Sequence, residues 1–287
     1  MAFKLLGDII RWRVSARINT RIKKYLASGC KPWSVGYKEH KEVFLRNVLR
    51  DKDLLNRFLH NQVLPARYGF RIDERVIEYP WILCQLSMAE HLMLDAGSVL
   101  NFEFILDNPV FRSRTIVVYN LSPESVVRRS NVSYIYGDLR NTILKNECFD
   151  EIVCISTLEH VGMNNTMLYS KNTRFNECRL DDYQNVIKEF QRLLKPGGRL
   201  FITVPYGRYQ NLGWLQQFDA QMIRKVLDTF QGSLNSVVYY KYFSDGWRSA
   251  DADMCADCCY FDIHSQPAYE SDYAAAARAV VCIKMVK

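Results

Sequence analysis

Six polar or small residues stand at or just after the ends of four strand-like apolar segments, at positions where ligand-binding groups are expected. They are Asp95, Gly97, Ser98, Asn120, Asp138 and Ser156. Carboxylate and amide oxygens accept hydrogen bonds from hydroxyl and amino groups, and a glycine lets the backbone approach a ligand closely. Residues 95–97 alone are as consistent with an ordinary turn as with a ligand site, so the surrounding elements decide the interpretation.

Strand-like segments alternate with helical ones over the C-terminal two thirds of the chain. Apolar runs cover residues 91–95, 115–120, 132–136, 151–156, 199–204, 236–243 and 279–286. Helical patterns lie between them at residues 102–106, 123–129, 181–194 and 219–229. This alternation predicts an α/β fold in which a parallel sheet lies between helices. In such doubly wound sheets, ligands bind at the carboxyl ends of the strands.

The N-terminal third is predicted to be helical. Helical patterns cover residues 39–49, 51–63 and 81–88, and Pro80 is placed to open the last of them. Strand patterns are not convincing in this part of the chain. We therefore expect a basic amphipathic helix at residues 1–31, a helical cap at residues 32–90 and an α/β domain at residues 91–287.

Four motifs in the α/β region resemble those of class I S-adenosylmethionine-dependent methyltransferases. FDEIVCISTLEHV and LLKPGGRLFITVP are similar to the fourth and fifth strands of that family, in this order and spacing, and NLSPE and GDLRN fit its second and third strands. The resemblance covers residues 91–287. It implies a Rossmann-like, doubly wound sheet of seven strands, with the last strand antiparallel and inserted beside the fifth. It also implies an enzyme with S-adenosylmethionine as its cofactor.

The resemblance assigns roles to individual residues at the strand ends. Asp95 and Gly97 would line the methionine end of the cofactor. Asn120 stands where the family usually has an acid that holds the ribose hydroxyls. Asp138 matches the residue that binds the adenine amino group, and Leu139 lies beside it.

Two further positions complete the implied cofactor site, and two departures from the family pattern affect it. Ser98 extends the first turn, and Ser156 would lie near the methyl-bearing sulfonium. The usual glycine-rich turn is reduced to one glycine, because Val99 and Asn101 stand where glycines are common. Asn120 is uncharged, although it still accepts a hydrogen bond. We expect cofactor binding to be retained, because the other strand ends keep polar groups.

His160 is the leading candidate for a catalytic base. The methyl donor supplies most of the reactivity, so the protein must align the acceptor and remove its proton. His160 follows the fourth strand, near the expected methyl group, and imidazole titrates in the useful range. The alternative is that the Glu159–His160 pair only caps or supports the following segment. A metal is not expected, because Ser156 stands where the metal-binding variant of the family has an acid.

The long polar segment at residues 162–182 is expected to select the acceptor. Such loops over a catalytic face commonly carry specificity. The candidate acceptor-binding residues in it, suited to the hydroxyl and acidic groups of a sugar, are Asn164, Asn165, Tyr169 and Arg174, and the segment at residues 208–214 after the fifth strand adds Tyr209. The alternative is an ordinary surface loop.

Charge and cysteine content restrict the remaining possibilities. The net charge is +7, and residues 1–31 carry eight basic and one acidic side chains, so the remainder is neutral. A neutral globular part disfavours nucleic acid as a partner. The nine cysteines, without a secretory signal, indicate reduced thiols and a cytoplasmic location. The cysteines of CADCC at residues 255–259 are interpreted as reduced thiols, because a zinc site needs four ligands.

The sequence thus predicts an O-methyltransferase that acts on a sugar hydroxyl of a bacterial glycan or its precursor. The EYPW and STLEHVGMNN segments resemble uncharacterised methyltransferases of bacterial polysaccharide biosynthesis clusters. Residues 1–31 could attach the protein to an anionic membrane surface or to a membrane-bound glycan assembly protein, as a peripheral protein at the inner face. The alternative function is a catalytically degenerate methyltransferase fold that serves as a scaffold or partner subunit.

Overall fold

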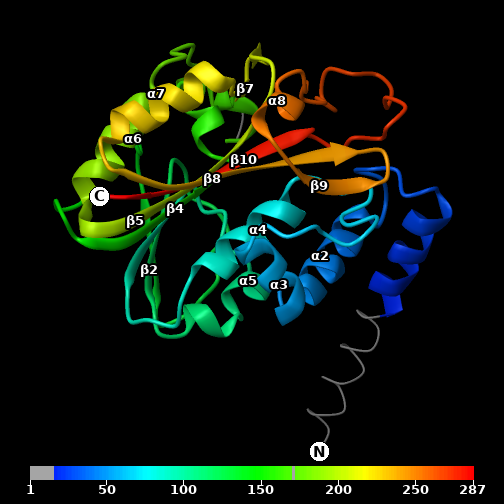
Figure 1. Cartoon of the computed structure of the whole chain (residues 1–287), viewed down its shortest axis with the longest axis horizontal. Coiled ribbons are helices and arrows are strands. Elements are labelled where there is room, and N and C mark those ends of the chain that lie inside the picture. The colour runs from blue at the N-terminus through cyan, green and yellow to red at the C-terminus, as the bar shows by residue number, and fades with distance from the viewer. Residues whose placement is uncertain (1–15, 170–171) are drawn as a thin grey trace, which may run out of the picture.

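A twisted sheet of eight strands organises the chain in the computed structural model, which describes residues 16–169 and 172–287 (Figure 1). The strand order is β3-β2-β1-β4-β5-β10-β8-β9. The first five strands are parallel, and β10 is antiparallel to both of its neighbours. The bounds are β1 Leu92–Ala96, β2 Thr115–Asn120, β3 Val132–Tyr136, β4 Phe149–Ile155, β5 Leu194–Pro205, β8 Ser233–Phe243, β9 Gly246–Ala250 and β10 Ala279–Val286.

The doubly wound α/β fold and the inserted antiparallel strand are confirmed, but the predicted count of seven strands is wrong by one. The additional strand is β9, which pairs antiparallel with β8 at the edge of the sheet. It follows β8 after a two-residue turn, and Trp247 N donates to the carbonyl oxygen of Tyr68. A five-residue edge strand has too little apolar alternation to be separated from its hairpin by pattern alone.

Helices cover both faces of the sheet (Figure 1). On one face, α6 Tyr183–Leu193 and α7 Ala220–Phe230 bury apolar residues that recur every three or four positions, such as Val186, Ile187 and Phe190. On the other face lie α2 Tyr37–Val48, α3 Lys52–Leu59, α4 Arg75–Gln85 and α5 Glu103–Leu106. Shorter elements are η1 Pro109–Phe111, η2 Leu158–His160, η3 Asn165–Met167, η4 Thr173–Phe175, β6 Gln210–Asn211, β7 Gln216–Gln217 and α8 Ala252–Cys255.

The helix predicted at residues 123–129 does not form. Side chains from other elements satisfy the backbone groups of this segment instead of a helical ladder. Asn101 Nδ2 donates to the carbonyl oxygen of Ser125 (2.8 Å), and Val127 N donates to Tyr134 Oη (2.9 Å). The segment is therefore held in an irregular conformation against α5 and β3, despite a proline suited to the first turn of a helix.

Helix α4 begins at Arg75, six residues before its predicted start, so Pro80 lies inside it. A proline inside a helix removes the hydrogen bond to the carbonyl four residues earlier, which here belongs to Val76. The hydroxyl of Tyr68 donates to that carbonyl oxygen at 2.5 Å. The tertiary contact thus replaces the missing backbone donor and lets the helix continue through Pro80.

Replacing Tyr68 by phenylalanine is expected to lower the free energy of unfolding by about 1–3 kcal/mol, because the buried carbonyl of Val76 loses its donor. Urea unfolding monitored by circular dichroism measures this change. Tyr136→Phe is a control, because Tyr136 is 40% exposed. Equal stability of the Tyr68→Phe and Tyr136→Phe variants would contradict this account of the helix.

The start of the chain packs against its own domain where the structure describes it. Residues 16–27 are helical, and the part of the predicted helix at residues 1–15 lies outside the described residues. Tyr25 is fully buried, Arg21 forms an ion pair with Glu39 (2.5 Å), and Lys23 and Lys24 are exposed. Among the described residues, no helix is long and apolar enough to cross a membrane.

Candidate active site

Four of the predicted cofactor residues line one small cavity at the carboxyl ends of the strands. They are Gly97 after β1, Asn120 at the end of β2, and Asp138 and Leu139 after β3. Thr157 and His160, which follow β4, complete the inner wall of this cavity. Parallel strands bring these residues together because their carboxyl ends meet at one edge of the sheet. We call this space the strand-end cavity.

Gly97 is required by both its backbone conformation and its surroundings. Its φ is +103°, a region that side chains rarely adopt, and a Cβ atom there would lie 2.1 Å from Thr157 Oγ1. The close approach of the β1 and β4 turns leaves the backbone of residue 97 facing the cavity. A single glycine therefore supplies the close backbone approach that family members achieve with several.

Asn120 is held by the polar segment that follows β4. Its Oδ1 atom accepts hydrogen bonds from Tyr169 Oη (3.1 Å) and from the backbone N of Leu121 (3.0 Å). Tyr169 thus occupies the hydrogen-bonding position that the resemblance assigns to a ribose hydroxyl. Asn165 and Tyr169 both line the strand-end cavity. These two residues, predicted to bind the acceptor, therefore lie beside the predicted cofactor residues.

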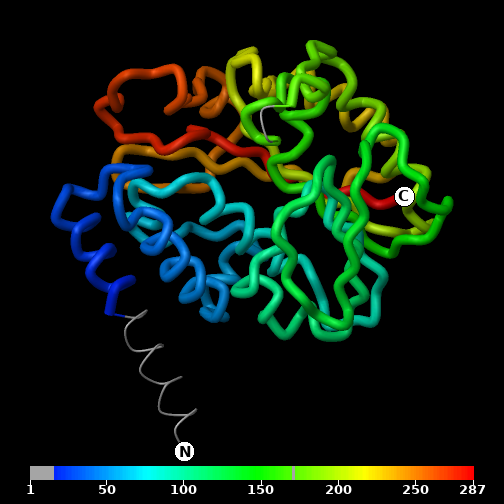
Figure 2. The backbone as a smooth tube through the Cα atoms, turned by 180° about the vertical axis from the view of Figure 1, so that it is seen from behind, coloured from blue at the N-terminus to red at the C-terminus, as the bar shows by residue number. Residues whose placement is uncertain are grey.

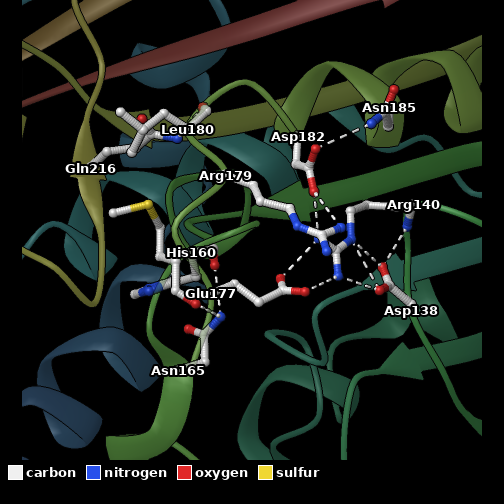
Figure 3. Close-up of polar contacts among 11 residues, drawn as sticks. Asp138, Arg140, His160, Asn165, Glu177, Arg179, Leu180, Asp182, Asn185 and Gln216 are labelled. Carbon is white, nitrogen blue, oxygen red and sulfur yellow. Dashed lines mark hydrogen bonds and ion pairs between the residues drawn. The ribbon is translucent and has the colours of Figure 1, made fainter. Parts of the chain in front are cut away.

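Asp138 is bound by Arg140 in a cluster that reaches the polar segment (Figure 3). Arg140 donates to both carboxylate oxygens of Asp138 (3.0 and 2.6 Å), to Asp182 (2.5 Å) and to Glu177 (3.0 Å). Burial alone would raise the pKa of Asp138, but the hydrogen bonds from Arg140 lower it. The carboxylate is therefore ionised, an acceptor suited to an adenine amino group.

The residues of the strand-end cavity fit a nucleoside cofactor, although the cavity measures only about 60 Å³. Cofactor sites are typically about 300–1,000 Å³. The side chains of Tyr169 and Arg140 line the cavity and reduce its volume. Both side chains have rotatable bonds, so a change of rotamer would enlarge the cavity. In addition, the buried Oδ1 atom of Asn165 has no hydrogen-bond partner among the described residues and remains able to accept one from a ligand. The Tyr169 hydroxyl occupies one acceptor site of Asn120 Oδ1, the atom that the resemblance assigns to the ribose.

The other three predicted cofactor residues do not line the strand-end cavity. Asp95 is fully buried and accepts hydrogen bonds from the backbone N of Val99 (3.2 Å) and of Leu100 (3.0 Å), which closes the turn after β1. Its burial raises its pKa to about 7. Ser98 bonds to Glu124. Ser156 belongs to a second cavity.

This second cavity, of about 650 Å³, adjoins the strand-end cavity, and His160 lines both. Its wall near β4 contains Ser156 and Glu159. The opposite wall comes from distant parts of the chain, including Trp33, Glu74 and Tyr260. Trp33 Nε1 donates to the carbonyl oxygen of Ala275 (2.6 Å), which joins the N-terminal cap to the C-terminal loop at residues 260–276, as the two views also show (Figures 1 and 2). We call this space the acceptor cavity.

His160 is oriented as a neutral base. Its Nδ1 atom lies 3.0 Å from the carbonyl oxygen of Trp214, and a carbonyl only accepts, so Nδ1 carries the proton. Nε2 is then the unprotonated nitrogen. Burial lowers the pKa of His160 to about 4, so the imidazole is neutral over the physiological range. The ring can therefore accept a proton at the junction of the two cavities.

Glu78 links α4 to residues at the ends of β4 and β5 by hydrogen bonds. Its fully buried Oε1 atom accepts hydrogen bonds from Ser156 Oγ and Thr203 Oγ1, both at 2.6 Å, and its other oxygen pairs with Arg75. The Ser156 hydroxyl is thus directed to Glu78. Arg75 and Glu74 reach the acceptor cavity from the start of the same helix.

The remaining predicted acceptor residues lie away from both cavities. Asn164 accepts from the backbone N of Thr166, Arg174 lies over the ring of Phe175 (4.4 Å), and Tyr209 is 40% exposed. Sequence reasoning did not select Trp33, Glu74 or Tyr260. Their only sequence signal was polar or aromatic residues in helical and loop segments far from the motifs.

Comparison with known proteins gives the reaction class. Residues 94–202 match the family model described as a methyltransferase domain, and these residues contain β2 to β4, His160 and most of β1 and β5. Residues 94–202 thus form a methyltransferase domain, and S-adenosylmethionine-dependent methyl transfer is the reaction class of this enzyme. The strand order described above agrees with this α/β domain. No protein of curated function is significantly similar in sequence.

Solved methyltransferase structures are similar to this chain at low identity. A candidate methyltransferase from Bacillus halodurans is 13% identical, with a TM-score of 0.48 over 73% of this chain and 98% of that one. The 1,6-didemethyltoxoflavin-N1-methyltransferase of Burkholderia thailandensis, with bound 1,6-didemethyltoxoflavin and S-adenosylhomocysteine, is 12% identical, with a TM-score of 0.44 over 86% and 89%.

The cysteines and acids of the methyltransferase form no metal centre in the part of the chain that the structure describes. No group of three or more His, Cys, Asp or Glu residues there has the arrangement of a metal site. Cys255, Cys258 and Cys259 are free thiols. Burial raises the pKa of the Cys255 thiol to about 12, which keeps it protonated.

Replacing Tyr169 by phenylalanine is expected to tighten S-adenosylmethionine binding about five-fold. The cofactor must displace the Tyr169 hydroxyl from Asn120, and one such hydrogen bond contributes about 1 kcal/mol. Calorimetric titration of the wild type and the variant measures the difference. Tyr209→Phe serves as the matched control outside the cavity. Weaker binding by Tyr169→Phe would show instead that the hydroxyl contributes to holding the cofactor.

Proposed function

We propose that this methyltransferase transfers the methyl group to a hydroxyl oxygen of a sugar in a bacterial glycan or its precursor. The observation that carries this proposal is the placement of His160. A neutral imidazole with Nδ1 fixed by the Trp214 carbonyl stands where the cofactor side and the acceptor side of the site meet. A hydroxyl acceptor requires such a base, because its proton must leave as the oxygen is methylated.

The chain's part in the reaction is alignment and proton removal. When bound, S-adenosylmethionine supplies an electrophilic methyl group on a sulfonium. With the cofactor bound, His160 Nε2 would take the proton of the acceptor hydroxyl as the methyl group passes from the sulfonium sulfur to the hydroxyl oxygen. The products are a methyl ether and S-adenosylhomocysteine, and the imidazolium then releases its proton to water. Because Nδ1–H remains bonded to the Trp214 carbonyl, the ring keeps its orientation through this cycle.

The composition of the acceptor cavity supports a polyhydroxyl ligand. Trp33, Trp214 and Tyr260 offer aromatic surfaces, and Glu74 and Glu159 offer carboxyl groups. Aromatic rings bind the apolar faces of ring-shaped ligands, while carboxyl groups bind hydroxyls. Burial raises the pKa of Glu74 to about 8, so this side chain is a neutral acid at pH 7 and can donate as well as accept. A volume of about 650 Å³ accommodates a mono- or disaccharide.

A transfer assay with ¹³C-methyl-labelled S-adenosylmethionine tests the proposal. The acceptor panel contains methyl α-glycosides of glucose, mannose, galactose and rhamnose, with glycine and ethanolamine as amine comparators. We expect new ¹³C signals in the O-methyl region for one or more glycosides. Transfer to the amines alone would contradict the proposal.

A catalytically degenerate scaffold is the second candidate function. It is motivated by the single glycine after β1 and by the uncharged Asn120. The retained Gly97 approach and the ionised Asp138 favour cofactor binding over this alternative. Cofactor titration distinguishes the two, because a scaffold with a lost site would give no binding heat.

We further propose that the basic residues at 1–31 hold the enzyme at an anionic membrane surface or at a membrane-bound glycan assembly protein. In the described part of this segment, Arg17, Lys23 and Lys24 are exposed, whereas Tyr25 packs inward, which favours electrostatic attachment. Sedimentation with phosphatidylserine vesicles is expected at low salt and should weaken strongly at 0.5 M salt or when Arg17, Lys23 and Lys24 are together replaced by glutamine. Failure of the intact protein to sediment with vesicles would exclude the lipid surface.

A further inference from the structure

Two buried polar groups of the acceptor cavity have no hydrogen-bond partner in the described part of the chain. They are Oε2 of Glu159 and Nε1 of Trp214. Glu159 is only 2% exposed, and both residues line the cavity that also contains His160. More than about nine in ten buried polar groups in folded proteins are hydrogen-bonded, so two orphaned groups in one cavity point to a ligand.

Both groups are tied structurally to His160. Glu159 directly precedes His160 in η2, and the Trp214 carbonyl holds His160 Nδ1. The rings of His160 and Trp214 are 5.3 Å apart between centroids. Because Glu159, Trp214 and His160 all line this one cavity, a ligand that contacts the first two also lies beside His160.

The chemistry of the two groups defines what they can bind. An indole N–H only donates, whereas a carboxyl group accepts and, when protonated, donates. Burial raises the pKa of Glu159 well above its usual range, so this side chain is a neutral acid rather than a fixed negative charge. A hydroxyl group both accepts and donates, and it satisfies the indole N–H and the carboxyl together. An ammonium group cannot accept from the indole.

We infer that the acceptor presents two neighbouring hydroxyl groups, of which one faces His160 Nε2 and is methylated while the other lies between the Glu159 carboxyl and the Trp214 indole N–H. This inference rests on the proposed function and narrows it to vicinal diols. It makes Glu159 and Trp214 specificity-determining residues. The product is then a methyl ether beside a free hydroxyl, because the second hydroxyl is bound but not activated.

The first test follows the Trp214 indole directly. The ¹⁵N-labelled protein, loaded with S-adenosylhomocysteine, is titrated with cis- and trans-cyclohexane-1,2-diol and with cyclohexanol. Trp214→Phe assigns the Trp214 signal among those of the five tryptophans. We expect at least one diol to shift this signal and cyclohexanol to leave it in place. Glu159→Ala should abolish the diol-specific shift while S-adenosylhomocysteine binding and the melting temperature stay at wild-type levels or above, because an unpaired buried carboxyl has been removed.

The second test uses turnover. A glycoside that is methylated in the ¹³C assay is compared with the analogue that lacks the hydroxyl next to the methylated one. A site built to bind a hydroxyl rejects the analogue without it, and we expect at least about a 100-fold lower kcat/KM. Glu159→Ala should reduce this preference to less than ten-fold.

The outcomes separate the inference from the function on which it rests. Equal methylation of the glycoside and its deoxy analogue overturns the inference and leaves hydroxyl methylation intact. Transfer only to amines overturns both. Absence of any methylated glycoside together with an unmoved Trp214 signal also counts against both.

Discussion

Replacing His160 by glutamine is expected to lower kcat for methyl transfer by about 10²–10⁴-fold, the usual contribution of a positioned general base. Glutamine approximates the size of the imidazole and can still donate to the Trp214 carbonyl, but its amide cannot take a proton. The change should therefore act on proton removal, with S-adenosylmethionine affinity within a few-fold of wild type. Initial rates at saturating cofactor, combined with calorimetry, separate the two effects.

His60 provides the matched control. Its Nδ1 atom also lies 3.0 Å from a carbonyl, that of Asn56, but His60 is exposed at the C-terminal cap of α3 and lines neither cavity. His60→Gln should retain wild-type turnover. A His160→Gln variant with wild-type turnover would remove His160 from the mechanism and leave it a structural support for the Trp214 segment.

The pH dependence of the wild type provides a second test of the same base. Burial favours the neutral imidazole and lowers the pKa of His160 to about 4, so the base remains available until the pH falls towards 4. The acid limb of kcat/KM should accordingly lie near pH 4, well below the value of about 6.5 for an exposed histidine. An acid limb near pH 6.5 would contradict a buried, neutral His160.

Replacing Gly97 by alanine is expected to lower the free energy of unfolding by about 2–4 kcal/mol and to weaken cofactor binding at least ten-fold. The added Cβ would lie 2.1 Å from Thr157 Oγ1, which forces the β1 and β4 turns apart, and a φ of +103° adds backbone strain. Because Gly97 and Thr157 both line the strand-end cavity, the displacement would distort the cofactor site. Urea unfolding and calorimetric titration measure the two effects.

Gly197→Ala is the control that separates the steric clash with Thr157 from the strain of a positive φ. Gly197 also has a positive φ, +76°, but a Cβ there would meet no atom within 4 Å. Its substitution should cost about 1 kcal/mol from backbone strain alone and leave cofactor binding unchanged. Equal losses for the two variants would show that the Thr157 contact has no role in shaping the site.

The sheet was predictable because its strands are buried apolar runs bounded by turn residues. The predicted bounds of β2, β3 and β10 agree with the observed residues, and Asn120 and Asp138 lie at the strand ends as expected. The errors occurred where tertiary contacts override local preference. Tyr68 lets α4 continue through Pro80, and Asn101 and Tyr134 hold residues 125–127 out of a helix.

The acceptor side was less predictable than the cofactor side. Gly97, Asn120 and Asp138 follow from the family motifs, since each occupies a fixed position relative to a strand. The acceptor cavity instead combines Trp33, Glu74 and Tyr260, which are brought together only by packing of the N-terminal cap against the C-terminal loop. No local pattern encodes that contact, so the chain offered no signal for it without a structure.

Calorimetric titration of the full-length protein with S-adenosylmethionine tests the central claim most directly. We predict one binding site with a micromolar dissociation constant, weakened at least ten-fold in Gly97→Ala and unchanged in Gly197→Ala. Absence of binding heat at high protein concentration would contradict a functional cofactor site and favour the scaffold alternative.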